Sequence, residues 1–543
     1  MDDKKLYELG QQLFSKRSTL LSLWQEMAEN FYPERADFTY RRSLGTDFAE
    51  NLTTSYPILI RRDLGNYFSF MLRPTDKPWF QMAVKHEGVE AEMVEDQQSL
   101  AWLQWATKVQ RKAMYDRSSM FIRAAREGDH DFATFGQCVI SIELNRARSG
   151  LLYRNWHLRD VAWSENADGK IGSIYRKWKP TARELITLFG KNVHPQVKTM
   201  MEKSPNEEIE CIHMVVEADM VDGQFNTPYV SIYYDITHDY TIEKVGVYSM
   251  IYVIPRWQTV SGSQYAFSPA TVAGLPDARL LQAMTYTLLE AGEKQVNPPM
   301  IAVQEAIRSD ISIYAGGITW VDKAYDEKLG EVLRPLTQDK SGMPLGVDMA
   351  RDTRFMLAEA FFLNKLNLPT RAPEMTAYEV GQRIQQYIRD ALPLFEPMEM
   401  EYNGAICEET FALLLRSGAF GSPFDIPQGL IGQDIQFSFE SPLHDAIERE
   451  KGNRFIEAQQ FIAASVQLDP TTALLVDAKT ALRDVLKGIG VPANWVNSEE
   501  EVQEVIEKEE RKQEAATLLA GMQQGADVVK TLGDAGLPLE GGE

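Results

Sequence analysis

Apolar residues near the start of the chain recur at steps of three and four, the spacing of one face of an α-helix. The pattern runs as far as Pro33, a residue without the amide proton that a continuing helix needs. We therefore expect an amphipathic helix at the start of the chain. Its apolar face contains Leu6, Leu9, Leu13, Leu20, Trp24, Met27 and Phe31.

The same spacing predicts a second helical region from about Val94 to Glu127. Short runs rich in β-branched and aromatic residues follow, separated by turn residues, and such runs are typical of strands. The middle third, Cys138–Val260, is therefore predicted to be a mainly antiparallel sheet with one inserted helix at Thr181–Phe189. The runs are QCVISIEL, LLYRNWHL, GSIYRKWK, IECIHMVVEA, YVSIYYDIT and MIYVIPRWQTV.

Three further helices are predicted in the second half of the chain. The first covers Pro276–Val296, because proline and aspartate are favoured in a first helical turn and an Asn-Pro-Pro sequence ends the pattern. At 1.5 Å per residue it would be about 30 Å long. The second covers Val347–Leu366, after a strand-like and turn-rich insert, and the third covers Thr376–Arg416.

The composition is that of a globular protein, with 44% apolar and 25% charged residues. No apolar run approaches the roughly 20 residues needed to cross a bilayer, and the start lacks the apolar core of a signal peptide, so no membrane is expected as a partner. Cys138, Cys211 and Cys407 are far apart, which fits reduced core residues rather than a disulfide or zinc site. The net charge of −22 argues against a generic nucleic-acid binder but is compatible with weak contact with DNA.

Motifs that would indicate catalysis are missing from the sequence. It has no G-x-x-x-x-G-K-[ST] phosphate loop and no G-x-S-x-G elbow, and HEGVE at 86–90 has Glu90 where a zinc helix needs its second histidine. His130 and Asp131 could form an acid–base pair, but no nucleophile motif accompanies them, so core roles are the simpler interpretation. No catalytic residue, cofactor or metal is predicted.

Four stretches, taken in order, carry a family resemblance. They are REGDHDFATFGQCVISIE (126–143), SGSQYAFSPATVAGLPDARLLQAMTYTLLEAGEKQVNPPM (261–300), PEMTAYEVGQRIQQYIRDALPLFEPMEMEYNGAICEETFALLLRSGAF (373–420) and ALRDVLKGIGVPANWVNSEEEVQEVIEKEERKQ (481–513). Together they resemble the head-to-tail connector, or portal, proteins of short-tailed bacteriophages (podovirus type).

The resemblance implies a dodecameric ring at one vertex of the capsid in the virion, assembled in the host cytoplasm. Double-stranded DNA would pass through its channel during packaging and ejection. Its partners would be the terminase large subunit, the major capsid and scaffolding proteins, and tail adaptor proteins. Such proteins are conduits and docking rings without catalysis of their own.

The resemblance also implies an α+β portal fold with a wing, a two-helix stem, a small clip and a helical crown. The wing–stem turn would include Tyr265, Phe267, Ser268 and Pro269, and the aromatic set Phe355, Phe361 and Phe362 would pack between subunits. The expected segments are 1–260 for N-terminal helices and wing, 261–297 for the wing–stem turn and first stem helix, 298–344 for the clip, 345–366 for the second stem helix, 367–375 for a tunnel loop, 376–444 for the long wing helix and closing strands, and 445–543 for an acidic crown and tail.

The stretch KLNLPTRAPEM would then enter the channel as the tunnel loop. Pro369 and Pro373 keep the two flanking helices from fusing, and Thr376 with Glu379 forms a capping box for the next helix. A ring of cations inside an acidic tube would give passing DNA weak, periodic contacts. The residues assigned to this site are Lys365, Asn367, Pro369, Thr370 and Arg371.

Other interpretations of the sequence stay open at this stage. Lys365 and Arg371 could be solvated charges beside a helix end. The protein could instead be a DNA-processing enzyme, such as a metal-dependent nuclease or a packaging ATPase. It could also be a tail or scaffold component that forms no channel.

Overall fold

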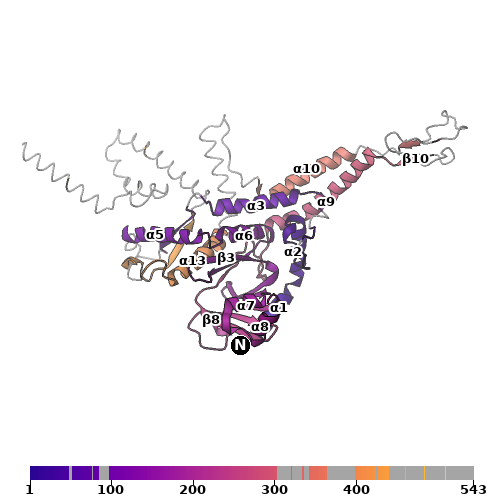
Figure 1. The fold of residues 1–543 in the computed structure, drawn as a ribbon. Coiled ribbons are helices and arrows are strands. Elements are labelled where there is room, and N and C mark those ends of the chain that lie inside the picture. Colours follow the sequence, from indigo (N-terminus) through magenta and orange to yellow (C-terminus); the bar gives the residue numbers. More distant parts are fainter. Residues whose placement is uncertain are drawn as a thin grey trace, which may run out of the picture. The chain divides into compact units, whose positions relative to one another are not determined.

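The computed structural model describes residues 1–43, 45–47, 52–75, 78–84, 97–302, 320, 333–335, 342–363, 398–422 and 426–439, and the single residues 459, 482 and 508. The chain divides into two compact units, one formed by residues 1–81, 107–421 and 436–443 and the other by the remaining residues. Figure 1 shows the described helices and strands, most of which belong to the first unit.

The N-terminal apolar pattern folds into two helices, α1 (Asp3–Lys16) and α2 (Ser18–Phe31), where a single helix was expected. The break falls at Arg17, whose buried guanidinium donates hydrogen bonds to the backbone carbonyls of Leu158 (2.6 Å) and Arg159. Burial lowers the pKa of Arg17 to about 10. These two carbonyls replace the hydrogen bonds to water that the guanidinium loses on burial. The chain therefore turns at Arg17 and keeps this side chain buried.

The second predicted helical region is also divided, into α5 (Gln97–Met114) and α6 (Phe121–Phe135). Between them the Asp116 carboxylate accepts a hydrogen bond from the backbone N–H of Ser118 (2.8 Å), a local turn that competes with helix. Met120 then adopts a positive φ of 58°, which a helix interior does not allow. The predicted helical region is thus confirmed as two helices, and α6 continues eight residues beyond Glu127.

Two antiparallel sheets confirm the prediction for the middle third and, with the helices, the α+β class. The strand order is β3-β2-β9 in one sheet and β4-β5-β6-β7-β8 in the other. Strands β4 and β8 were not predicted, because β4 is short and β8 is interrupted by charged residues and glycine. The bounds are β2 (Val139–Leu144), β3 (Leu151–Trp156), β4 (Val161–Glu165), β5 (Ile171–Trp178), β6 (Cys211–Glu217), β7 (Tyr229–Asp235), β8 (Tyr240–Val247) and β9 (Tyr252–Val253).

Helices cover both faces of the five-stranded sheet (Figure 1). The predicted inserted helix is α7 (Ala182–Phe189), whose first turn is closed by a capping box between Thr181 and Glu184; α8 (Pro195–Lys203) follows it. Cys211 packs with α7 and α8, whereas the next residue, Ile212, packs with α1. This alternation is the two-residue period of a strand.

The helix pair of the second half differs from its predicted bounds. α9 (Pro269–Val296) begins seven residues before Pro276, because the Ser268 hydroxyl caps its first turn and Pro269 occupies the first helical position. Its 28 residues make it about 42 Å long. α10 (Gly342–Ala360) begins before Val347 and ends before Leu366, because Phe362 has a φ of 58°. Ser268 and Pro269, which were expected in a wing–stem turn, thus begin a helix. Helix α10 includes residues 342–344, which were expected to be the end of the clip.

The remaining described elements are short. Strands β10 (Met300–Ala302) and β11 (Leu333–Pro335) pair antiparallel between α9 and α10. A π-helical segment, Glu399–Gly404, leads into α13 (Ala405–Arg416), which confirms the predicted helix end at Arg416; residues 364–397 lie outside the described part. Strands β1 (Phe80–Val84) and β12 (Ile435–Phe439) form a two-stranded sheet, and 3₁₀ turns lie at Pro33–Arg35, Leu158–Asp160, Gly190–Asn192, Ala218–Met220 and Gln428–Leu430.

Helix α6 is the central element of the first unit, with ten of its 15 residues buried. It packs against α2, α9, the strands β2 and β3, and α3 (Tyr56–Leu72), a helix that the sequence pattern did not single out. The buried Asp129 of α6 forms an ion pair with Arg73 and accepts a hydrogen bond from Ser69 (2.5 Å). Burial opposes the charge on Arg73, yet the carboxylate beside it raises its pKa above the ordinary value.

The next two residues of α6 hold two more arginines. Asp131 accepts a forked pair of hydrogen bonds from Arg35, at 3.0 and 2.6 Å. His130 Nδ1 lies 3.1 Å from Arg61 Nη1, and burial together with this arginine lowers the pKa of His130, so the neutral ring accepts the bond. The pair considered as a possible acid and base thus has structural partners.

Gly136, which ends α6, provides a test of the α6–α9 junction. It has a φ of 73°, and a Cβ there would lie 2.2 Å from the backbone carbonyl carbon of Phe267. Gly136→Ala is expected to lower the free energy of unfolding by more than about 2 kcal/mol, through backbone strain and a clash that no rotamer change relieves. Gly262 has a φ of 87° with open space around it, so Gly262→Ala should cost only about 1 kcal/mol. Equal losses in denaturant titrations would contradict the close approach.

Candidate functional site: the α9–α10 helix pair

Helices α9 and α10 pack along each other (Figure 1). The buried residues of α10 recur at steps of three and four, at Ala350, Thr353 and Leu357, so one face of the helix is covered. Gly346 sets the distance between the helices farther out, because a Cβ there would lie 2.9 Å from Cδ2 of Leu288.

The inner end of the pair is fixed to the N-terminal helices by apolar contacts. Phe361, just after α10, is fully buried and packs on Phe31 of α2 with ring centroids 5.3 Å apart. Gly274 of α9 lies close to Phe361, and a Cβ on Gly274 would lie 3.0 Å from Phe361 and 3.3 Å from Leu357. Phe361, expected to pack between subunits, therefore packs within its own chain.

Polar contacts reinforce this inner end. Gln282 of α9 accepts hydrogen bonds from the backbone N–H groups of Thr53 (2.8 Å) and Thr54 (3.0 Å) and donates one to the Thr54 carbonyl. On α10, the Arg354 carbonyl accepts a hydrogen bond from the Tyr56 hydroxyl (3.0 Å). Both helices are thus bound to the segment that leads into α3.

The sides of the pair carry exposed apolar residues. On α10, Leu345, Met349 and Met356 lie four and seven residues apart, hence within about 40° of one another around the helix. Val347 and Phe355 lie roughly 120–160° away from Met349, on a different side. Met349 is 48% and Phe355 62% exposed. On α9 the exposed residues are Val272, Leu280, Tyr286, Leu289 and Val296.

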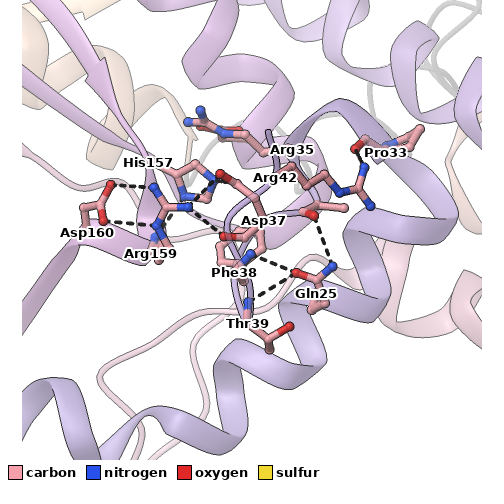
Figure 2. A network of polar contacts seen from close by, with 12 residues as sticks. Gln25, Pro33, Arg35, Asp37, Phe38, Thr39, Arg42, His157, Arg159 and Asp160 are labelled. Carbon is pink, nitrogen blue, oxygen red and sulfur yellow. Dashed lines mark hydrogen bonds and ion pairs between the residues drawn. The ribbon is translucent and has the colours of Figure 1, made fainter. Parts of the chain in front are cut away.

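The loop after α2 is held by the polar network in Figure 2. Asp37 accepts hydrogen bonds from His157 Nε2 (2.5 Å) and Arg159 Nη1 (2.6 Å), while His157 Nδ1 accepts the backbone N–H of Arg159 (3.0 Å). The second contact leaves the proton of the neutral ring on Nε2, facing Asp37. Gln25 of α2 accepts from the backbone N–H of Phe38 (2.8 Å), so the loop is tied to both the helix and the sheet region.

Partial burial would raise the pKa of Asp37, but the hydrogen bonds from His157 and Arg159 and the charge of Arg159 lower it to about 2. For His157, burial has the opposite effect and lowers the pKa of the ring. These groups form a structural clasp, in which each polar side chain bonds to another member of the network.

The described residues offer little for chemistry. No group of three or more His, Cys, Asp or Glu side chains among them could hold a metal ion. Cys138, Cys211 and Cys407 are buried, and burial raises the pKa of each thiol. In the part of the chain that the structure describes, no helix is long and apolar enough to span a bilayer.

The sequence-based site residues Lys365, Asn367, Pro369, Thr370 and Arg371 lie outside the described residues, as do the HEGVE stretch and nearly all of 445–543. Phe355, expected to pack between subunits, is exposed on α10, whereas the other exposed apolar residues of α9 and α10 were not singled out. A signal for them was present, because apolar residues in both helices occupy more positions around the helix than one buried face can use.

Comparison with known proteins shows the family of this chain. Residues 3–496 match the model of the family described as bacteriophage head to tail connecting protein. The chain belongs to this family. As a connector, it is a component of the phage particle that joins head to tail.

Two relatives extend the similarity over the whole connector. A probable portal protein of Bordetella phage BPP-1 is 23% identical over 96% of this chain and 94% of its own length. The portal protein of Salmonella phage epsilon15 is 21% identical over 98% and 96%. A chain in the solved virion of a native gene transfer agent particle is 9% identical, covering 80% of this chain and 94% of that one, with a TM-score of 0.34, which is too low to carry an argument.

The Asp37 clasp gives the connector a defined response to acid. Because the pKa of Asp37 is about 2 in the folded chain and ordinarily near 4, the unfolded chain takes up the proton first as pH falls. The stability that Asp37 contributes is present above about pH 4 and is lost toward pH 2. In Asp37→Asn this component should be missing, so the variant should be less stable at neutral pH and its unfolding free energy should change less between pH 4 and 2.

Asp219→Asn is the matched control, since this exposed carboxylate forms no ion pair with any described residue. Its pH profile, measured by denaturant titration at each pH, should run parallel to that of the unchanged protein. Parallel profiles for both variants would show that the clasp does not contribute.

Proposed function

We propose that the connector forms a closed ring at one vertex of the phage head and that the double-stranded genome passes through its central channel during packaging and ejection. The observation that carries this proposal is the match over nearly the full chain to two relatives named as portal proteins. In this proposal the protein acts as a conduit and a docking platform and catalyses no reaction itself.

The sides of the helix pair support a ring. A head-to-tail ring needs two different surfaces on each subunit, one for each neighbour. The stripe of Leu345, Met349 and Met356 and the separate pair Val347 and Phe355 are two such apolar surfaces on one helix. Exposed apolar side chains gathered on a slender helix pair would be covered by the neighbouring stems of the ring.

Charged substitutions on the two sides test the ring. Met349→Lys and Phe355→Lys should each prevent ring closure, because a lysine would be buried unpaired in every junction. Negative-stain images and sedimentation velocity should then show subunits or short oligomers. Gln295→Lys adds the same charge at an exposed position of α9 and should leave rings intact.

Mixing the two variants sharpens the test. In a head-to-tail ring, Met349→Lys subunits keep the other side intact and can join Phe355→Lys subunits through one unmodified junction, but the next junction is doubly charged. An equimolar mixture should therefore stop at heterodimers. Rings formed by either variant alone, or a mixture that stays monomeric, would contradict the assignment of the two sides.

Further parts of the proposal rest on the sequence. The ring would contain twelve subunits, with Lys365, Asn367, Pro369, Thr370 and Arg371 on a tunnel loop, a wing, stem, clip and crown arranged in the family plan, and docking sites for the terminase large subunit, capsid and scaffolding proteins and tail adaptors. Discrete cations in an acidic channel would grip the duplex weakly, since many attractive contacts would stall its movement.

The tunnel-loop assignment predicts a packaging phenotype. Lys365→Ala with Arg371→Ala should leave ring assembly unchanged but reduce the amount of DNA packaged or retained per particle, measured as the ratio of DNA to protein in purified particles. Lys191→Ala with Lys203→Ala, which removes two exposed cations of the α7–α8 region, is the control. Particles of normal DNA content from the loop variant would count against the assignment.

A further inference from the structure

A basic surface lies where the turn between α5 and α6 meets the loop between β2 and β3. The backbone N–H of Tyr153 in β3 donates to the carbonyl of Ser119 in the turn (2.8 Å), and a Cβ on Gly150 would lie 3.6 Å from the Ser118 hydroxyl. Residues far apart in sequence are thereby placed together. We call this surface the basic patch; its exposed cations are Lys112, Arg117, Arg146, Arg148 and Arg154.

The local charge is opposite to that of the chain. Residues 108–126 and 144–154 contain nine lysines and arginines and a single acid, Asp116, a net of +8, so the rest of the chain carries −30 to give the total of −22. The nine are Lys108, Arg111, Lys112, Arg117, Arg123, Arg126, Arg146, Arg148 and Arg154.

Four of the five cations of the patch are not used inside the described fold, whereas Arg154 acts on the nearby Glu143 carboxylate and lowers its pKa against the effect of burial. The side chains of Lys112, Arg117, Arg146 and Arg148 form no ion pair or hydrogen bond with any described residue. Asp116 is occupied by the backbone N–H and hydroxyl of Ser118. Elsewhere in the same unit, arginines such as Arg35 and Arg73 are paired with carboxylates.

Arg148 adds an independent observation. It has a φ of 54°, a conformation that glycine or asparagine adopts with less strain. The turn does not use the Arg148 side chain, since the backbone N–H of Arg148 donates to the Asn145 carbonyl and the Asn145 side chain accepts from the Ser149 N–H. The arginine side chain is therefore not needed to form the turn, and its charge is available at the surface.

We propose that the basic patch binds the sugar–phosphate backbone of double-stranded DNA, at a place on the connector distinct from the stem helices and the tunnel loop. Arginine predominates in the patch, and its planar fork matches phosphate oxygens. The patch has no exposed aromatic ring, which a single-strand site would use for stacking. Binding is independent of base sequence and depends steeply on salt.

The test is fluorescence anisotropy of a labelled 20-base-pair duplex with the full-length protein between 50 and 200 mM salt. The triple variant Arg117→Ala, Arg146→Ala, Arg148→Ala should bind at least tenfold more weakly at 100 mM salt, and the slope of log affinity against log salt should fall by about 3. The control Arg183→Ala, Lys191→Ala, Lys203→Ala removes the same charge from exposed positions around α7 and α8 and should change affinity less than twofold.

Arg148→Gly separates binding from folding, because glycine relieves the positive φ while removing the cation. It should keep or raise the melting temperature and still weaken duplex binding. The proposal is overturned if the patch and control triple variants bind the duplex equally. It is also overturned if polyglutamate of equal charge binds the patch more tightly than the duplex does, which would identify a docking site for an acidic protein. Ring formation is scored separately, so failure of the patch and failure of the ring are distinguishable.

Discussion

Three consecutive side chains of α6, two carboxylates and a neutral histidine, hold three arginines near the centre of the first unit, and the packing of the N-terminal helices on α6 depends on these contacts. Neighbouring residues of a helix point about 100° apart, so Asp129, His130 and Asp131 reach in different directions, to Arg73, Arg61 and Arg35. Removing one member of such a pair leaves a buried charge uncompensated, which typically costs about 3–5 kcal/mol. The segments that carry these arginines, around α2 and α3, are thereby fixed in register with α6.

The helix pair takes its position from the same helix. The Ser268 hydroxyl donates to the Ala133 carbonyl (2.8 Å), and the Thr271 hydroxyl donates to the Thr134 carbonyl (2.7 Å), so the first turn of α9 is bonded to the last turns of α6. Gly136 allows this approach because it has no Cβ. One face of each helix is therefore buried, from Ala270 to Leu281 on α9 and from Ala350 to Leu357 on α10, while the apolar sides meet no described residue that would cover them. The fold of the helix pair is thus complete, but apolar side chains on its surface are left uncovered.

The sequence predicted the features that local periodicity records and missed those set by tertiary contacts. Apolar spacing located helices at the N-terminus, at 182–189 and at the α13 end, and strand-like runs located most of both sheets. It did not find the break at Arg17, since only the Leu158 and Arg159 carbonyls, 141 residues or more away, make that burial favourable. Nor did it find the true start of α9, where a Ser-Pro cap outweighed the more conspicuous Pro276. His130 and Asp131 could be recognised as unusual, but their arginine partners could not be chosen from sequence.

Net charge is a poor guide to what one surface of such a protein binds. At physiological ionic strength charges are screened over about 8 Å, a length much shorter than a 28-residue helix of this fold. A phosphate near the basic patch therefore responds to Arg117, Arg146 and Arg148 and hardly to acidic residues elsewhere. The total of −22 limits non-specific adhesion over most of the surface. An acidic chain with one concentrated basic surface can thus let DNA slide past most of its surface and still hold it at a chosen place.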